Sequence, residues 1–102
     1  MNCCLISRVW RRCAMPTLSM FFGIVIRMFL EKGGRHHLPH IHAYHADESA
    51  VYGLDGSLLE GRLPAKQEKL VLAWMAIHEE ELRANWRLLQ ETGEFFRIDP
   101  LR

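Results

Sequence analysis

Hydrophobic residues recur at every second position from Met20 to Leu30, a pattern typical of a β-strand. Alternate positions of a strand point to opposite sides of its sheet. One side of this strand is wholly apolar and is predicted to face the core: Phe22, Ile24, Ile26, Met28 and Leu30. The other side is mixed, because Arg27 lies on it between Val25 and Phe29.

Turn residues divide the following segment into three more strands. Gly33 and Gly34, flanked by charged residues, predict a turn over residues 31–35. Pro39 favours an extended chain around it, and Asp55-Gly56 between apolar residues is a strong hairpin signal. The strands predicted from these signals cover residues 40–44, 49–54 and 57–63. We therefore expect a four-stranded, mainly antiparallel sheet.

Residues 65–91 follow Pro64 without a helix-breaking residue, which predicts a helical segment. Gly93 is the expected C-terminal cap. The hydrophobic face drifts near residues 78–80, so the segment is either one long helix or two abutting helices. Apolar side chains of the tail, Phe95, Phe96 and Ile98, are expected to close the core. The face predicted to pack on the sheet contains Leu70, Val71, Trp74, Ile77, Leu82, Trp86 and Leu89.

The predicted fold class is α+β: a small two-layer domain with helices covering one face of the sheet. The chain has 102 residues, enough for one small domain, which we assign to residues 15–102. Residues 1–14 are expected to be a flexible or misassigned N-terminal extension, because they lack periodicity. This segment holds all three cysteines, Cys3, Cys4 and Cys13, which indicates reduced thiols rather than a disulfide framework.

Charge and hydropathy limit the partners that the chain can have. The formal net charge is +1, but three arginines lie in residues 1–14, and the remaining chain carries slightly more acidic than basic groups. Contact with a nucleic acid would therefore be local, because a general coat protein needs a basic stripe. The apolar run of residues 18–30 is too short to span a bilayer. We expect a cytoplasmic protein without a membrane partner.

Five of the six histidines fall within ten positions, between His36 and His45. If residues 40–44 are extended, His40, His42 and Tyr44 share one side of the sheet, while Ile41 and Ala43 face the core. Two imidazoles at this spacing are close enough to act on one atom. The cluster is the strongest indication of chemistry in the chain.

Three interpretations of the cluster remain open. His40 and His42, helped by His37, could perform acid–base catalysis on a phosphodiester, with Arg27 stabilising negative charge. Substrate contacts would then come from Arg35, Lys66 and Tyr44. Alternatively, His40 and His42 could hold a metal ion. The metal site would be completed by His37, His45, Asp47 or Glu48. The acid–base interpretation, in contrast, needs no metal or other cofactor. Thirdly, the histidines could be structural or binding residues only.

Two aromatic residues and one histidine of the helical segment are interpreted as packing residues. Trp74 and Trp86 recur at helical spacing, which is typical of a core, and His78 lies on the same arc. The run from Glu79 to Glu81 is interpreted as a solvated helix surface that could also dock a basic partner.

Several blocks of the sequence, in order, closely resemble the bacterial and archaeal family of unknown function numbered four-one-six-zero. The resemblance covers residues 15–101 and is carried by Met15-Pro16-Thr17, the strand 22–28, the histidine segment 36–43, the segment 59–64, and Trp74, His78, Leu82 and Trp86. By position, the matching signature residues are Arg27, His37, Pro39, His40, His42, Gly61, Pro64, Trp74 and Trp86. The resemblance implies a second small protein encoded nearby, in an arrangement similar to toxin–antitoxin pairs.

Together these observations favour a toxin-like component of a toxin–antitoxin pair that acts on RNA as a metal-independent ribonuclease. In this hypothesis His40, His42 and His37 are catalytic and Arg27 stabilises charge. The alternative is a non-catalytic binding or regulatory module, either the antitoxin or a transcription-linked adaptor. A metal-dependent hydrolase that uses His40 and His42 is the third hypothesis. The sequence leaves the oligomeric state open.

Overall fold

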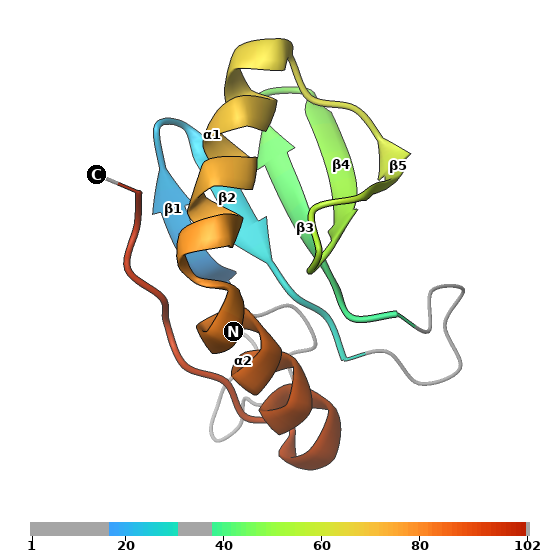
Figure 1. Cartoon of the computed structure of the whole chain (residues 1–102), viewed down its shortest axis with the longest axis vertical. Coiled ribbons are helices and arrows are strands. Elements are labelled where there is room, and N and C mark those ends of the chain that lie inside the picture. The colour runs from blue at the N-terminus through green and yellow to red at the C-terminus, as the bar shows by residue number, and fades with distance from the viewer. Residues whose placement is uncertain (1–16, 31–37, 102) are drawn as a thin grey trace.

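The computed structural model describes residues 17–30 and 38–101, which form two layers, a β-sheet and a pair of helices (Figure 1). The sheet has five antiparallel strands in the order β1-β2-β3-β4-β5. Its strands are β1 (Thr17–Phe21), β2 (Ile24–Arg27), β3 (His40–His45), β4 (Glu48–Gly53) and β5 (Leu58–Gly61). The helices are α1 (Ala65–Ile77) and α2 (Glu79–Thr92). The predicted α+β class is confirmed.

The sheet has one strand more than predicted, because a tight hairpin divides the first apolar run. Phe22 and Gly23 form its two-residue turn, with φ values of 49° and 76°. Two successive positive φ angles are those of a type I′ turn, whose twist matches that of the flanking strands. Phe22 is 60% exposed in this turn, so its predicted place in the core was wrong.

The predicted alternation is confirmed in the strands that follow. Ile24, Ile26 and Met28 are fully buried, as are Ile41 and Ala43 of β3. Leu30 is only partly buried but packs against the same core. The helical layer covers this face of the sheet, and α1 crosses in front of it in Figure 1.

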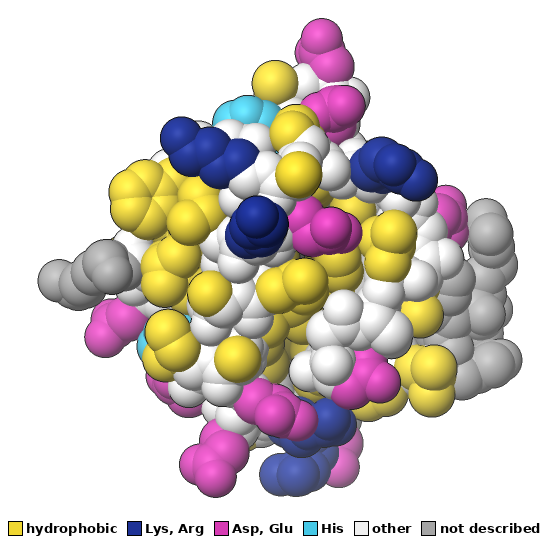
Figure 2. Space-filling view, turned by 45° about the horizontal axis from the view of Figure 1, so that its top comes forward, with side chains coloured by type: hydrophobic (Ala, Val, Ile, Leu, Met, Phe, Trp, Pro, Cys, Tyr) yellow, Lys and Arg dark blue, Asp and Glu magenta, His cyan; other side chains and the backbone are white. Residues whose placement is uncertain are grey.

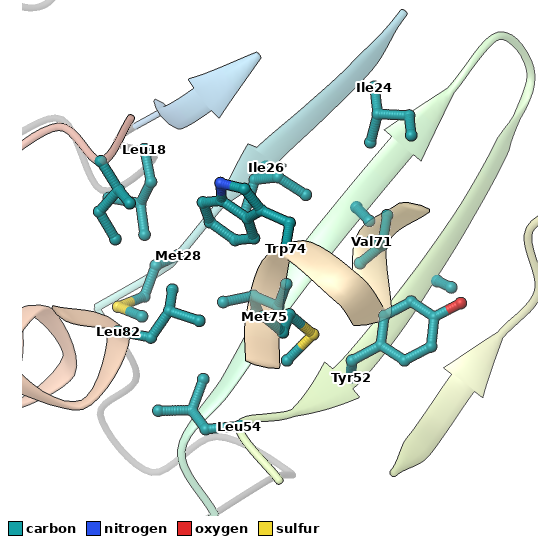
Figure 3. Close-up of a cluster of buried hydrophobic side chains, with 14 of the residues drawn as sticks. Leu18, Ile24, Ile26, Met28, Tyr52, Leu54, Val71, Trp74, Met75 and Leu82 are labelled. Atoms are coloured by element: carbon teal, nitrogen blue, oxygen red, sulfur yellow. The ribbon is translucent and has the colours of Figure 1, made fainter. Parts of the chain in front are cut away.

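Trp74 lies at the centre of the contact between the layers (Figure 3). Its side chain has no exposed surface, and its ring centroid lies 5.3 Å from that of Phe21 on β1. Tyr52 of β4 is also fully buried, and its hydroxyl donates a hydrogen bond to a carboxylate oxygen of Glu68 on α1, at 2.9 Å. Burial, reinforced by this carboxylate, raises the pKa of Tyr52 far above its ordinary value. The interpretation of Trp74 as a core residue is confirmed.

The helical segment consists of two abutting helices that meet at His78. His78 has φ −111° and ψ 25°, outside the helical range, and its Nδ1 pairs with a carboxylate oxygen of Glu81. Ile77, the last residue of α1, is 65% exposed, which contradicts its predicted place on the buried face. Gly93 caps α2 in the left-handed conformation, as predicted.

The C-terminal tail runs back along the outer edge of β1 (Figure 1), where the Ile98 N–H donates a hydrogen bond to the carbonyl oxygen of Leu18 at 2.9 Å. Buried Asn85 of α2 donates from Nδ2 to the carbonyl oxygen of Phe96 and accepts the Phe96 N–H, at 2.8 and 2.9 Å. Trp74 Nε1 donates to the carbonyl of Asp99 at 2.8 Å. Ile98 is buried as expected, but the Phe95 and Phe96 side chains are exposed and do not close the core.

Replacing Asn85 with leucine should lower the free energy of unfolding by about 2–3 kcal/mol. The substitution leaves the N–H and the carbonyl of Phe96 without their partner in a partly buried environment, and such groups are costly to leave unpaired. Urea denaturation measures the change. A loss below about 0.5 kcal/mol would show that the tail does not depend on this clamp.

Candidate functional site

Strand pairing places side chains on the outer face of the sheet, the face turned away from α1, in two rows that cross the strands. Residues paired directly across antiparallel strands point to the same side. The first row takes one residue from each strand: Thr17, Arg27, His42, Val51 and Glu60. The neighbouring row consists of Met20, Val25, Tyr44 and Ser49.

Arg27, His42 and Tyr44 form a compact group on this face. The rings of His42 and Tyr44 are stacked, with an interplanar angle of 13° and centroids 6.4 Å apart. The Arg27 guanidinium carbon lies 5.7 Å from the centroid of the Tyr44 ring. These distances and the strand register confirm that the three side chains share one side of the sheet, as the sequence predicted.

The guanidinium of Arg27 has hydrogen-bonding capacity to spare. Its Nε is buried and has no acceptor among residues 17–30 and 38–101. An arginine side chain offers five N–H donors in a planar fork that matches a phosphate or a carboxylate. Arg27 can therefore bind an anion that reaches the outer face while its plane stays over the Tyr44 ring.

His40 belongs to the same strand side but is only 1% exposed, which differs from the expected solvent-facing pair. Its Nδ1 lies 2.7 Å from the carbonyl oxygen of Leu38, so Nδ1 carries the proton and donates it. Its ring packs between those of His42 and Trp86, at centroid distances of 5.3 and 5.1 Å. Strand alternation gives the side to which a residue points and not its depth, because the helix that covers His40 comes from a distant part of the chain.

A continuous series of ring contacts thus runs from α2 onto the outer face: Trp86, His40, His42 and Tyr44. Phe29 contacts His42 edge-to-face, with centroids 4.3 Å apart. The prediction placed Phe29 on the correct side of the sheet but gave it no role. The sequence indicates this position of Phe29, because it lies two residues after Arg27 and therefore points to the same side of an extended chain.

Other predicted site residues lie elsewhere. Lys66 is exposed on α1 and lies in the helical layer, on the opposite side of the sheet from His42, so it is not part of this group. His45 lies at the far end of β3, where its Nδ1 is 3.2 Å from the carbonyl oxygen of Gly23 in the first hairpin. Arg35 and His37 fall outside the described residues.

The described residues do not assemble a metal-binding group. Within residues 17–30 and 38–101, no three His, Cys, Asp or Glu side chains lie together in an arrangement that could hold a metal ion. His45, Asp47 and Glu48, which the sequence offered as completing ligands, lie in or beside the turn between β3 and β4. The pair His40 and His42 therefore gains no third ligand from them.

Comparison with known proteins gives a family for the chain. The family model named "Domain of unknown function (DUF4160)" matches residues 23–87, a span that includes every strand from β2 to β5, α1 and the first part of α2. The chain belongs to this family. No curated protein and no solved structure matched it. The DUF4160 match includes Arg27, His42, Tyr44 and Trp86, and so covers the site described above.

Charge and helix length add two observations about the DUF4160 chain. In the view of Figure 2, Lys and Arg side chains lie among Asp and Glu side chains, and no continuous basic surface forms on the face shown. No described helix is long and apolar enough to cross a membrane. The face shown therefore offers no continuous basic surface to a nucleic acid.

Proposed function

We propose that the protein is a non-catalytic RNA-binding module that holds single-stranded RNA on the outer face of its sheet. The observation that carries the proposal is the group formed by Arg27, His42 and Tyr44. Sheets that bind single-stranded RNA expose aromatic side chains on which unpaired bases stack, beside cations that contact the backbone. Here both kinds of group lie on adjacent strands within one cluster of contacts.

Each residue of the group has a distinct part in this proposal. The guanidinium of the partly buried Arg27 donates hydrogen bonds to a phosphate. The half-buried rings of Tyr44 and His42 give unpaired bases a stacking surface, to which Met20 and Val25 add apolar area in the second row. Since stacking suits every base, sequence preference is expected to be modest.

Binding is better supported than the ribonuclease mechanism inferred from the sequence. In acid–base cleavage, both imidazoles must come within hydrogen-bonding distance of the substrate. His40 is buried against Trp86, and Nε2 of His42 is also a buried atom. We therefore assign His42 a stacking role and His40 a packing role.

The setting of this binding activity is proposed from the family resemblance. That resemblance favours a second small protein as partner, as in toxin–antitoxin pairs, with this chain as the RNA-binding, regulatory member. Such a pair would act in the cytoplasm, where its RNA is found. Co-purification of the product of a neighbouring reading frame would support a pair.

Replacing Arg27 with glutamine should weaken the binding of a labelled oligouridine of about ten nucleotides by about tenfold. The substitution removes one phosphate contact, so the dependence of log K on log salt should also fall by about one unit. Fluorescence anisotropy at several salt concentrations measures both. Arg97→Gln is the matched control, because it removes the same charge from an exposed position in the tail.

Equal affinities for the wild type, Arg27→Gln and Arg97→Gln would contradict the proposal, provided that circular dichroism shows all three folded. The same samples test the catalytic hypothesis by gel electrophoresis. Intact RNA is the expected result. Cleavage that disappears in His42→Gln would restore the ribonuclease interpretation.

A further inference from the structure

A cavity lies away from the outer face, between α2 and the ends of β3 and β4. It has a volume of about 310 Å³, at the lower end of the range for small-molecule sites. Trp86, Arg83 and Arg87 of α2 form one wall, and Pro39 and Leu54 form the apolar wall opposite. A smaller hollow of about 130 Å³ shares Pro39, Leu54 and Arg83 with it, so the two are adjacent, and together they are called the groove below.

Trp86 is held in place by the rest of the site. The buried ring of His40 packs against its indole, and the His40 Nδ1–H is fixed by the carbonyl of Leu38. Gln90, one turn further along α2, donates to the carbonyl oxygen of Phe29 at 3.0 Å and anchors the helix to the segment that follows β2. The half-buried Trp86 therefore offers the cavity an oriented aromatic wall without a large loss of side-chain freedom on binding.

The two arginines of the cavity differ in their partners. Arg83 donates two hydrogen bonds to one carboxylate oxygen of Glu79, at 3.0 and 3.1 Å. Arg83 also contributes, after the hydrogen bonds from Ser57, to holding the pKa of Asp55 below its usual value. Arg87 makes no hydrogen bond or ion pair with the part of the chain that the structure describes, so its guanidinium is available to an anion.

We infer that this groove binds a nucleoside monophosphate, either as a free nucleotide or as the 5′-phosphorylated end of an RNA. The base would lie between Trp86 and the apolar wall of Pro39 and Leu54, and its phosphate would take hydrogen bonds from Arg87. Glu91 also lines the cavity and repels the same phosphate. This inference does not depend on RNA binding by the outer face.

Substitutions at two exposed residues should change the affinity for a nucleoside monophosphate in opposite directions. Arg87→Gln removes the phosphate partner and should weaken the binding of uridine or adenosine monophosphate about tenfold. Glu91→Gln removes the repelling charge and should strengthen it about threefold. Titration calorimetry gives the affinities, and Arg97→Gln, expected within twofold of the wild type, controls for net charge.

Nuclear magnetic resonance locates the ligand independently. The indole N–H signal of Trp86 should move on addition of nucleotide, while that of Trp74, which is bonded to the Asp99 carbonyl, should stay in place. A 5′-phosphorylated oligouridine that moves this signal when the free monophosphates do not would identify an RNA end as the ligand. The 5′-hydroxyl oligouridine, which can still bind the outer face, should leave the signal unchanged.

The inference is overturned if neither the free monophosphates nor the 5′-phosphorylated oligouridine moves the Trp86 signal. It is also overturned if the ligand that moves the Trp86 signal binds Arg87→Gln with an affinity within twofold of that for the wild type. If Arg27→Gln loses oligouridine binding while its Trp86 signal still moves on addition of nucleotide, the two sites are distinct. In that case the groove and the outer face bind independently.

Discussion

Replacing Trp74 with alanine should lower the free energy of unfolding by about 4 kcal/mol, the largest loss that we expect from a single core substitution. The side chain has no exposed surface and packs between β1 and the helical layer. Its Nε1 also secures the tail through the Asp99 carbonyl. Domains of this size are stable by roughly 5–15 kcal/mol, which makes the loss a large part of the total. A loss of this size should lower the unfolding temperature by about 20 °C.

Ile77→Ala is the matched control for Trp74→Ala. Both residues lie on the face of α1 that the sequence predicts to be buried, but Ile77 is 65% exposed. Its replacement should change the free energy of unfolding by less than about 0.5 kcal/mol. Thermal and urea denaturation measure both variants. Similar losses for the two would show that α1 packs with the face that periodicity alone predicts and not as described.

Gly61→Ala should cost about 3 kcal/mol and disturb the end of β5. Gly61 has φ +74°, a left-handed conformation that is unfavourable for alanine. An added Cβ would also lie 2.3 Å from the backbone oxygen of Ser49 and 3.1 Å from the Cα of Ala50. These are backbone atoms of β4, so they cannot rotate away, and the strand pair must separate to admit the methyl group.

Gly93→Ala separates the two causes of this loss. Gly93 has a similar φ of +79°, but nothing lies within 4 Å of the position of an added Cβ. Only the conformational cost remains there, about 1 kcal/mol. Differential scanning calorimetry of both variants gives the difference. An equal loss of unfolding free energy at the two positions would mean that the close approach of β4 to Gly61 does not contribute to the destabilisation.

Local patterns in the sequence were sufficient to predict the sides of the strands. Alternation placed Arg27, His42 and Tyr44 together and put Ile41 and Ala43 in the core, because the period of a strand is a property of the backbone. Turn residues such as Asp55-Gly56 and caps such as Gly93 were predictable for the same reason. Each of these features depends on a few neighbouring residues.

Features that depend on less favourable turn residues or on distant packing were not predictable. The hairpin at Phe22-Gly23 was missed because phenylalanine rarely adopts a positive φ, and the usual turn signal is Asn-Gly or Asp-Gly. The burial of His40 requires Trp86, more than forty positions further along the chain. Asn85 was missed because a buried asparagine is recognised only when its partner, the backbone of Phe96, is known.

The central claim is that the outer face of the sheet, and not α1, binds single-stranded RNA that lacks a 5′-phosphate. Amide chemical-shift mapping of the protein labelled with nitrogen-15, titrated with the 5′-hydroxyl oligouridine, tests it most directly. We predict that the largest shifts fall on Val25, Arg27, His42 and Tyr44, with little change along α1. Shifts concentrated on α1, or none at these four residues when the RNA is in excess, would contradict the account.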